Sequence, residues 1–350
     1  MLLAPSDPNQ RRFDFACRHT RAAGGWLRRE EAIMGTAISV ELWADDARAG
    51  EAATAAVMEE MHRIDRCMSP HKPASELSRI NREAARHTVP LSDEMYTLVD
   101  RALHFSRLSQ GAFDISYAAV GRLYDYRQRL RPGDAALRAA QALVGWQQLQ
   151  LDPRSRSLRF AREGVCIDLG GIAKGHAVDR AVALLRKRGF AHAMVSAGGD
   201  SRVLGDRRGR PWTVAIRDPR RVGEVVAVLP LQDVSISTSG DYERYFDEEG
   251  QRHHHLIDPA TGRSPRSVHS VTILAGDGLT SEALSKTVFV MGVERGLALV
   301  NTLSDVDAVV VDAAGKLHAS SGLMQGVPQT APPAAAVRPN PSPTPQTLRP

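Results

Sequence analysis

A short run near the middle of the chain reads Asp168-Leu169-Gly170-Gly171-Ile172-Ala173-Lys174-Gly175-His176-Ala177-Val178-Asp179. The apolar residues 165–167 precede it and predict a strand, and the paired glycines predict a turn. A helix is expected from about Ile172 to Arg188, because Gly189 is typical of the position just beyond a helix C-terminus. The run therefore predicts a strand, a tight turn and a helix N-terminus in succession.

Helices and strands are both expected on either side of this run. Apolar residues at helical spacing predict helices at 45–67, 93–109, 134–144, 280–291 and 294–302, with Ser92 as the cap of the second. Alternating apolar residues or short apolar runs predict strands at 38–42, 149–151, 157–160, 192–196, 212–217, 224–231, 233–237, 253–257, 268–275, 307–311 and 316–319. This order predicts an α+β fold with mixed or antiparallel sheets flanked by helices, forming a two-lobed single body with a soft boundary near Gly145.

The composition is that of an ordinary globular chain. Its 350 residues are 43% hydrophobic and 24% charged, which fits one large domain or two intimate ones. No stretch of 18 apolar residues is present to span a bilayer. Three cysteines without a CxxC pair argue against a disulfide scaffold and a zinc cluster.

The net charge of +5 raises the question of a nucleic-acid partner. Forty of the 45 basic residues are arginines, and they are spread along the whole sequence. A nucleic-acid surface would be local and interleaved with aromatic residues. We therefore expect no nucleic-acid partner.

The two ends of the chain differ from the body. Residues 1–30 predict a disordered, Arg-rich leader in which Cys17 is a free thiol, and residues 325–350 predict a disordered Pro-rich tail. Residues 31–324 are expected to form the folded domain. Because no apolar run typical of a secretory signal is seen, the sequence as written predicts a cytoplasmic protein, or a periplasmic one if the true start lies elsewhere.

Two further polar turns follow apolar strands, Ser196-Ala197-Gly198-Gly199-Asp200 and Thr238-Ser239-Gly240-Asp241-Tyr242. Glycines let the backbone approach a ligand closely, and N–H groups at a helix N-terminus favour phosphate. Each turn alone fits a plain structural loop equally well, and the run at 168–179 is neither a Walker loop nor a clean GxGxxG. Together the three turns are expected to converge on one ligand, and Lys174 would add a positive charge if that ligand carries phosphate.

A histidine run supplies an acid–base candidate, because His253, His254 and His255 precede Leu256-Ile257-Asp258-Pro259. Along a strand, His253 and His255 would share one face and His254 the other. A metal site lacks a third ligand at suitable spacing. We therefore expect His253 and His254 to be structural or exposed, and His255 to be the functional residue.

These pieces together resemble the ApbE-type flavin transferases, described as FAD:protein FMN transferases. The resemblance runs from Met34 to about Gly292. It is carried by Met34-Gly35-Thr36; Met68-Ser69 followed by Ser75-Glu76-Leu77-Ser78-Arg79-Ile80-Asn81; Gly111-Ala112-Phe113-Asp114; the run at 168–179; Ala197-Gly198-Gly199-Asp200; Thr238-Ser239-Gly240-Asp241-Tyr242; and His255-Leu256-Ile257-Asp258-Pro259.

The resemblance implies a T-fold-like core and an enzyme that binds FAD and Mg²⁺. Such an enzyme would move the FMN half of FAD onto a Thr or Ser hydroxyl of an acceptor flavoprotein and release AMP, with His255 as the base. By similarity, the FAD contacts are Met34, Ala112, Phe113, Asp114, Asp168, Lys174 and Ile257, and the Gly171 carbonyl is a metal ligand. The turn residues Gly198, Gly199, Asp200, Thr238, Ser239 and Gly240 are further cofactor-binding candidates.

Two positions depart from the family pattern. His71 stands where the family usually has an aromatic residue stacking on the flavin, and an imidazole offers less area for stacking. The family also has an Asp and, four residues later, a Thr that both ligate Mg²⁺, whereas this chain has Glu282 and Lys286. Glutamate can still bind Mg²⁺, but an ammonium group cannot ligate a cation.

Two readings of Lys286 follow from this departure. In one, Lys286 joins the cofactor-binding residues and supplies part of the positive charge, by pairing with Glu282 or by contacting a phosphate. In the other, Lys286 turns outward and Ser285 or Thr287 serves as the metal ligand beside Glu282.

Three other functions remain as alternatives. A metal-dependent FAD pyrophosphatase would use water in place of the protein hydroxyl, and a non-catalytic FAD-binding protein would lack the reaction. The presence of His255 before an intact Asp258-Pro259 turn argues against the second of these. A Rossmann-type dehydrogenase would need a strict GxGxxG, which is missing.

Overall fold

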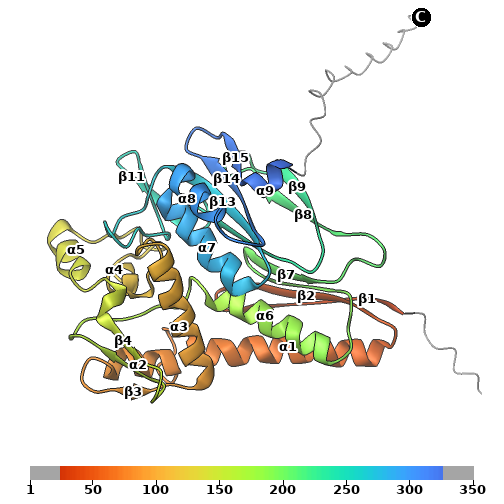
Figure 1. Cartoon of the computed structure of the whole chain (residues 1–350), viewed down its shortest axis with the longest axis horizontal. Coiled ribbons are helices and arrows are strands. Elements are labelled where there is room, and N and C mark those ends of the chain that lie inside the picture. The colour runs from red at the N-terminus through yellow and green to blue at the C-terminus, as the bar shows by residue number, and fades with distance from the viewer. Residues whose placement is uncertain (1–23, 326–350) are drawn as a thin grey trace, which may run out of the picture.

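An eight-stranded sheet forms the centre of the molecule in the computed structural model, which describes residues 24–325 (Figure 1). The strand order is β1-β2-β6-β7-β10-β13-β14-β15, and every neighbouring pair is antiparallel. The strands are β1 (Gly25–Ile33), β2 (Thr36–Ala44), β6 (Ala193–Ala197), β7 (Asp200–Leu204), β10 (Ser235–Gly240), β13 (Val268–Ala275), β14 (Val306–Asp312) and β15 (Leu317–Ala319).

One face of this sheet is covered by a row of helices, α1 (Ala47–Met68), α6 (Ala173–Lys187), α7 (Gly278–Met291) and α8 (Val293–Val300) (Figure 1). The alternation expected in the first strand places Ile38, Val40 and Leu42 in the core beneath these helices. On the opposite face, the hairpin of β8 (Trp212–Arg217) and β9 (Val225–Leu231) buries Trp212 and Leu231 against sheet residues. A second hairpin joins β11 (Tyr245–Glu248) and β12 (Gln251–His254).

A smaller three-stranded sheet, ordered β3-β5-β4, lies at one end of the molecule with most of the remaining helices (Figure 1). Its core is continuous with that of the large sheet, since Phe113 and Phe160 belong to the same buried cluster as Phe289. Its strands are β3 (Val89–Pro90), β4 (Leu149–Asp152) and β5 (Ser157–Phe160), and the helices are α2 (Glu76–Glu83), α3 (Asp93–Leu108), α4 (Ala118–Gly121), α5 (Asp134–Gln141) and the short η1 (Ile115–Tyr117) and η2 (Trp146–Gln148). Helix α9 (Ser321–Gln325) ends the described chain.

The expected α+β fold, with antiparallel sheets and helices in a single body, is therefore confirmed. Helix α6 begins and ends within one residue of the expected bounds, and Ser92 caps α3 by accepting a hydrogen bond from the Met95 N–H at 3.2 Å. Among residues 24–325, no helix is long and apolar enough to cross a membrane.

The expected leader is wrong at its end, because residues 25–30 lie in β1 and pair with β2 along its whole length. The pattern was hidden because β1 is an edge strand, where charged side chains such as Arg28 and Glu30 face solvent and pair with each other. Cys17 and the rest of the leader, and the Pro-rich tail beyond residue 325, lie outside the described residues.

Two other expected strands are also different. Residues 165–167 pair with no strand of the described chain. The Ile167 N–H donates instead to Asn81 Oδ1 at 2.8 Å, and the Ile167 carbonyl accepts from Asn81 Nδ2 at 2.9 Å. Strand β12 ends at His254, so His255 and Ile257 lie in the loop that follows. The polar residues 238–240 do not form a turn after a strand, because they belong to β10 itself.

Candidate active site

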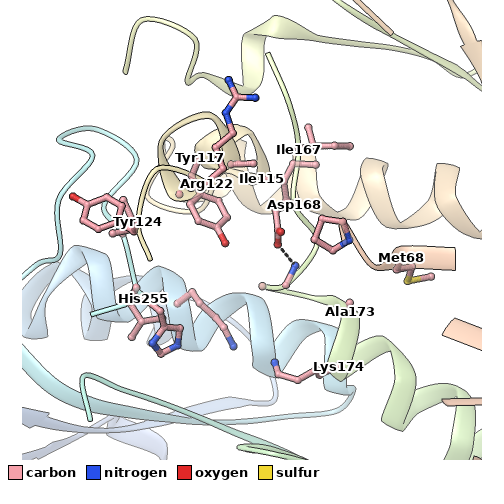
Figure 2. Close-up of a pocket in the computed structure, with 18 of the residues that line it drawn as sticks. Met68, Ile115, Tyr117, Arg122, Tyr124, Ile167, Asp168, Ala173, Lys174 and His255 are labelled. Atoms are coloured by element: carbon pink, nitrogen blue, oxygen red, sulfur yellow. Dashed lines mark hydrogen bonds between the residues drawn. The ribbon is translucent and has the colours of Figure 1, made fainter. Parts of the chain in front are cut away.

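A cavity of about 1520 Å³ opens between one part of the large sheet and the segments at residues 112–127 and 163–174, and most of the residues singled out from the sequence line it. Figure 2 shows Lys174 and His255 on one side and Asp168, Tyr117, Tyr124 and Arg122 on the other. The lining residues expected from the sequence are Met34, His71, Ala112, Phe113, Asp114, Asp168, Gly171, Lys174, Gly198, Gly199, Asp200, Thr238, Ser239, Gly240, His255, Ile257 and Lys286. Segments far apart in the chain therefore meet at one site.

The turn before α6 is held by its own carboxylate. Asp168 Oδ1 accepts the Gly170 N–H at 2.6 Å, the bond drawn as a dashed line in Figure 2. Burial raises the pKa of Asp168, and its contact with Gly170 and nearby cations opposes that rise. Gly171 lies under the Phe113 ring, because a Cβ there would be 3.0 Å from Phe113 Cε2.

Two ammonium groups share one buried carboxylate beside this turn. Glu282 on α7 is fully buried, and its Oε1 accepts hydrogen bonds from Lys174 Nζ and, at 3.2 Å, from Lys286 Nζ. Its Oε2 accepts the Gly175 N–H of α6 at 2.7 Å. Lys286 thus turns into the site, and the reading in which it turns outward is wrong.

A second carboxylate completes this charge cluster. Asp200 at the start of β7 lies with its Oδ2 2.7 Å from Lys174 Nζ, and its Oδ1 accepts from Ser237 Oγ at 2.5 Å. Although burial opposes its ionisation, Lys174 and Lys286 lower the pKa of Asp200. Burial likewise works against the charge on Lys174, but Asp200 and Glu282 raise its pKa above the ordinary value. Burial lowers the pKa of Lys286, and Glu282 and Asp200 oppose that shift. The cluster therefore joins two lysines to two carboxylates.

Ser285 lies behind this cluster and away from the cavity. Its side chain is fully buried, and its hydroxyl is within hydrogen-bond distance of Ser237 Oγ at 3.0 Å and Ser239 Oγ at 2.8 Å. Its hydroxyl also donates to the Glu282 carbonyl at 2.8 Å. Thr287 is equally buried and donates to the Ala283 carbonyl at 2.9 Å. The Ser285 hydroxyl therefore holds α7 against β10, and the Thr287 hydroxyl is engaged within α7 itself.

Two of the three expected Mg²⁺ ligands, Glu282 and Ser285, are already engaged by other groups. Mg²⁺ needs near-octahedral oxygen ligands at about 2.0–2.1 Å, but both Glu282 oxygens already accept N–H groups and Ser285 is engaged elsewhere. At about 4 Å and an effective dielectric constant of about 20, two unit charges interact by about 4 kcal/mol, so the Lys174 and Lys286 ammonium groups would offset the attraction of Glu282 and Asp200 for a divalent ion. Within residues 24–325, no group of three His, Cys, Asp or Glu side chains is placed to hold a metal ion.

His255 lies on the same side of the cavity as Lys174 (Figure 2). Its backbone N–H donates to the Arg244 carbonyl at 3.0 Å, and its buried Nδ1 has no hydrogen-bond partner within the described chain. Burial and the neighbouring cations lower the pKa of His255 to about 3. The imidazole is therefore neutral at pH 7 and able to accept a proton.

The other two histidines of the run are structural, as expected. His254 is buried, places its Nε2 2.9 Å from the Pro265 carbonyl and packs edge-on against Phe289. His253 stacks on Phe246 across the β11–β12 hairpin.

The loop after α3 is tied together by Asp114. Its Oδ1 accepts the Ser116 N–H and hydroxyl at 2.8 and 2.7 Å, and its Oδ2 accepts the Trp146 N–H at 2.6 Å. Burial raises the pKa of Asp114 despite these bonds. Asp114 thus fixes the shape of the cavity wall that Ala112 and Phe113 share.

A group of tyrosines in the cavity wall was missed from the sequence. Tyr124 and Tyr126 stack with ring centroids 5.8 Å apart, and Tyr117 lies beside them in the lining. Three of the six tyrosines of a chain with only 5% aromatic residues fall within ten positions, which is a signal that composition could have revealed. Arg122, Arg127 and Arg244 also line the cavity, but the even spread of arginine gave no signal for them.

The sequence matches the family model described as "ApbE family" over residues 34–310. The chain belongs to the ApbE family. The matched region contains every cavity residue expected from the sequence.

Known members of the ApbE family are similar to the chain over most of its length. It is 31% identical to the FAD:protein FMN transferase of Treponema pallidum over 318 residues, which cover 85% of this chain and 88% of that protein. It is 34% identical to the FAD:protein FMN transferase of Vibrio cholerae, covering 73% of this chain and 78% of that protein. The ApbE crystal structure from Thermotoga maritima superposes with a TM-score of 0.80 at 31% identity, covering 86% of this chain and 99% of that one.

Proposed function

We propose that the protein is an FAD:protein FMN transferase, which attaches FMN from FAD through a phosphoester to a Thr or Ser of an acceptor flavoprotein and releases AMP. The observation that carries this proposal is the meeting of His255, Lys174 and the glycine turns in one cavity of an ApbE-family chain. Relatives that match most of the chain bear the same name.

The cavity has the size and lining that FAD needs. Its volume of about 1520 Å³ exceeds the roughly 300–1,000 Å³ of ordinary small-molecule sites, which leaves room for a dinucleotide and an entering acceptor segment. The Tyr124–Tyr126 stack offers flat apolar surface for a ring system. Lys174 and the glycine turn at residues 170–171 suit the pyrophosphate.

The reaction is a displacement at one phosphorus atom of the pyrophosphate. The acceptor hydroxyl oxygen forms a bond to the FMN phosphorus while the bond from that phosphorus to the bridging oxygen breaks. AMP leaves with the bridging oxygen and its electron pair. The hydroxyl proton passes to His255, whose neutral imidazole faces the cavity.

His255 gains basicity when the ligand is bound. In the free protein its pKa of about 3 makes it a weak base, because burial and nearby cations oppose its protonation. The negative pyrophosphate offsets the charge of Lys174 and Lys286, so the pKa of His255 rises toward the working pH. The same cations stabilise the charge that develops on the phosphoryl oxygens.

The proposal is tested by incubating the full chain with FAD and a candidate acceptor that carries a Thr target, followed by intact-mass analysis. A covalent FMN adduct on the acceptor, with release of AMP, is the expected result. An acceptor with the target Thr replaced by Val is the control and should stay unmodified. Free FMN and AMP without an adduct would show that the protein hydrolyses FAD and would overturn the proposal.

His255→Asn tests the assignment of the base in the same assay. General-base catalysis contributes about 10²–10⁴-fold, so adduct formation should slow by that factor while FAD still binds. Unchanged transfer by this variant would remove His255 from the mechanism.

A further inference from the structure

The charge at the centre of the cavity comes from side chains at a position where the family pattern has a divalent cation. The resemblance places Mg²⁺ ligands at residues 282 and 286, but here these are a glutamate and a lysine that pair across one turn of α7. Lys286 Nζ lies 3.2 Å from Glu282 Oε1, and the lysine side chain is only 18% exposed. The ammonium group is therefore held inside the site.

In the part of the chain that the structure describes, all four carboxylate oxygens of Glu282 and Asp200 already accept hydrogen bonds. Glu282 Oε1 accepts hydrogen bonds from the Lys174 and Lys286 ammonium groups, and its Oε2 accepts one from the Gly175 N–H. One Asp200 oxygen pairs with the Lys174 ammonium group, and the other accepts a hydrogen bond from the Ser237 hydroxyl. A metal ion would have to break these contacts and lie against two positive charges.

Lys174 and Lys286 also provide hydrogen-bond donors for a bound pyrophosphate. Lys174 and Lys286 line the cavity from different elements, α6 and α7, and the shared Glu282 oxygen holds both ammonium groups beside each other. Each ammonium has three N–H donors, so donors remain for phosphate oxygens after Glu282 is satisfied. The remaining N–H donors of both groups can therefore bind the negatively charged oxygens of the pyrophosphate.

We propose that the Lys286 ammonium takes the place of the divalent cation, so that this chain binds the pyrophosphate of FAD without a metal ion. This inference rests on the proposed function for the identity of the ligand. Lys286 contacts the phosphate oxygens, and Glu282 holds Lys286 and Lys174 in position. The transfer reaction then proceeds in the presence of a chelator.

The first test measures FAD affinity by the quenching of flavin fluorescence, in EDTA and in millimolar Mg²⁺. The expected result for the natural chain is the same Kd within about twofold in both buffers. An affinity at least tenfold higher in Mg²⁺ would overturn the inference. Binding is read separately from transfer, so metal-independent binding without an FMN adduct would contradict the proposed function alone.

Lys286→Thr restores the family's residue and provides the second test. A hydrogen bond to a charged group is worth a factor of about ten to a hundred, so FAD affinity in EDTA should fall by that factor, and Mg²⁺ should recover part of it. Lys286→Arg keeps the charge and should stay insensitive to Mg²⁺. If Lys286→Thr binds FAD as tightly in EDTA as the natural chain, the inference is wrong.

Direct metal binding gives a readout that needs no flavin. In a titration with Mn²⁺ alone, followed by electron paramagnetic resonance, the natural chain should bind none at this site, and Lys286→Thr should gain one ion. Lys187→Thr, at the exposed end of α6, is the matched control and should behave like the natural chain in all three tests. Thermal unfolding of each variant verifies that it is folded, and one Mn²⁺ bound by the natural chain but lost in Glu282→Gln would overturn the inference.

Discussion

Replacing Gly175 with alanine is expected to destabilise the protein, although alanine is the better helix former. Gly175 lies in the first turn of α6, where alanine would ordinarily add up to about 1 kcal/mol. Here α6 and α7 touch through two facing glycines. A Cβ on Gly175 would lie 2.1 Å from the Gly278 carbonyl oxygen, and one on Gly278 would lie 2.4 Å from the Gly175 oxygen.

The size of the effect follows from that contact. Ordinary Cβ contacts lie at 3.4–4 Å, so the helices must separate by about 1.3 Å. Because the obstacle is backbone, overpacking should cost about 3 kcal/mol, the upper end of its usual range. Subtracting the gain in helix propensity leaves about 2 kcal/mol, and with about 2.1 cal/mol/K of unfolding entropy per residue over about 300 residues the melting temperature falls by about 3 °C.

Urea unfolding followed by circular dichroism measures this loss. Gly276→Ala is the matched control, because a Cβ there meets nothing within 4 Å, and its stability should change by less than about 0.5 kcal/mol. Gly175→Ala and Gly278→Ala together should cost less than the sum of the two single changes, since one separation of the helices accommodates both methyl groups.

A higher free energy of unfolding for Gly175→Ala would refute this prediction. If Gly175→Ala stabilised the protein, α6 and α7 would not be in contact at these glycines. The same variant should also weaken FAD binding, because moving α6 separates Lys174 and the Gly175 N–H from Glu282.

Three further predictions concern residues that shape the site. Asp114→Ala removes the acceptor for the Trp146 N–H and should cost about 2 kcal/mol, measured as a melting temperature about 3 °C lower. Asp179→Ala removes the acceptor for the Gly278 N–H at the start of α7 and should cost about 2–3 kcal/mol in urea unfolding, with Asp179→Asn losing less. The pKa of His255 is about 3 in the folded chain and about 6.5 in the unfolded chain. The unfolded chain therefore binds the proton first as pH falls below 6.5. Between those two pKa values the free energy of unfolding should drop by up to about 1.4 kcal/mol per pH unit. His255→Asn should make the fall in urea midpoint between pH 6.5 and pH 4.5 shallower, and equal slopes for the two proteins would contradict this account.

Much of the fold could be predicted because its elements carry local signals. The α6 helix has a glycine turn before it and Gly189 after it, and β13 has an apolar run of the length that the structure shows. Strand β1 could not be predicted, because an edge strand rich in charged residues has no apolar periodicity. Its pairing depends on β2, which only the folded chain supplies.

In the site, too, features with a local sequence signal could be predicted, and features that depend on tertiary contacts could not. Ordered motifs indicated which segments would meet, and the cavity contains them. The direction of Lys286 could not be predicted, because it depends on Glu282 being buried between α6 and α7 with Lys174 on the same oxygen. Ser285 was expected as a ligand only if Lys286 turned outward, and its hydroxyl lies 2.8 Å from Ser239 Oγ instead.

The cavity wall is drawn from Met34 at the β1–β2 turn to Val290 near the end of α7, so a bound ligand contacts residues from almost the whole length of the described chain. A ligand that fills it acts as a reversible cross-link between the large sheet and the segments at residues 112–127 and 163–174. Unfolding of either part removes half of the ligand's contacts, so the protein with ligand bound should unfold as one cooperative unit. A partly folded chain in which only one of these parts is formed would bind no ligand and would not be stabilised by it.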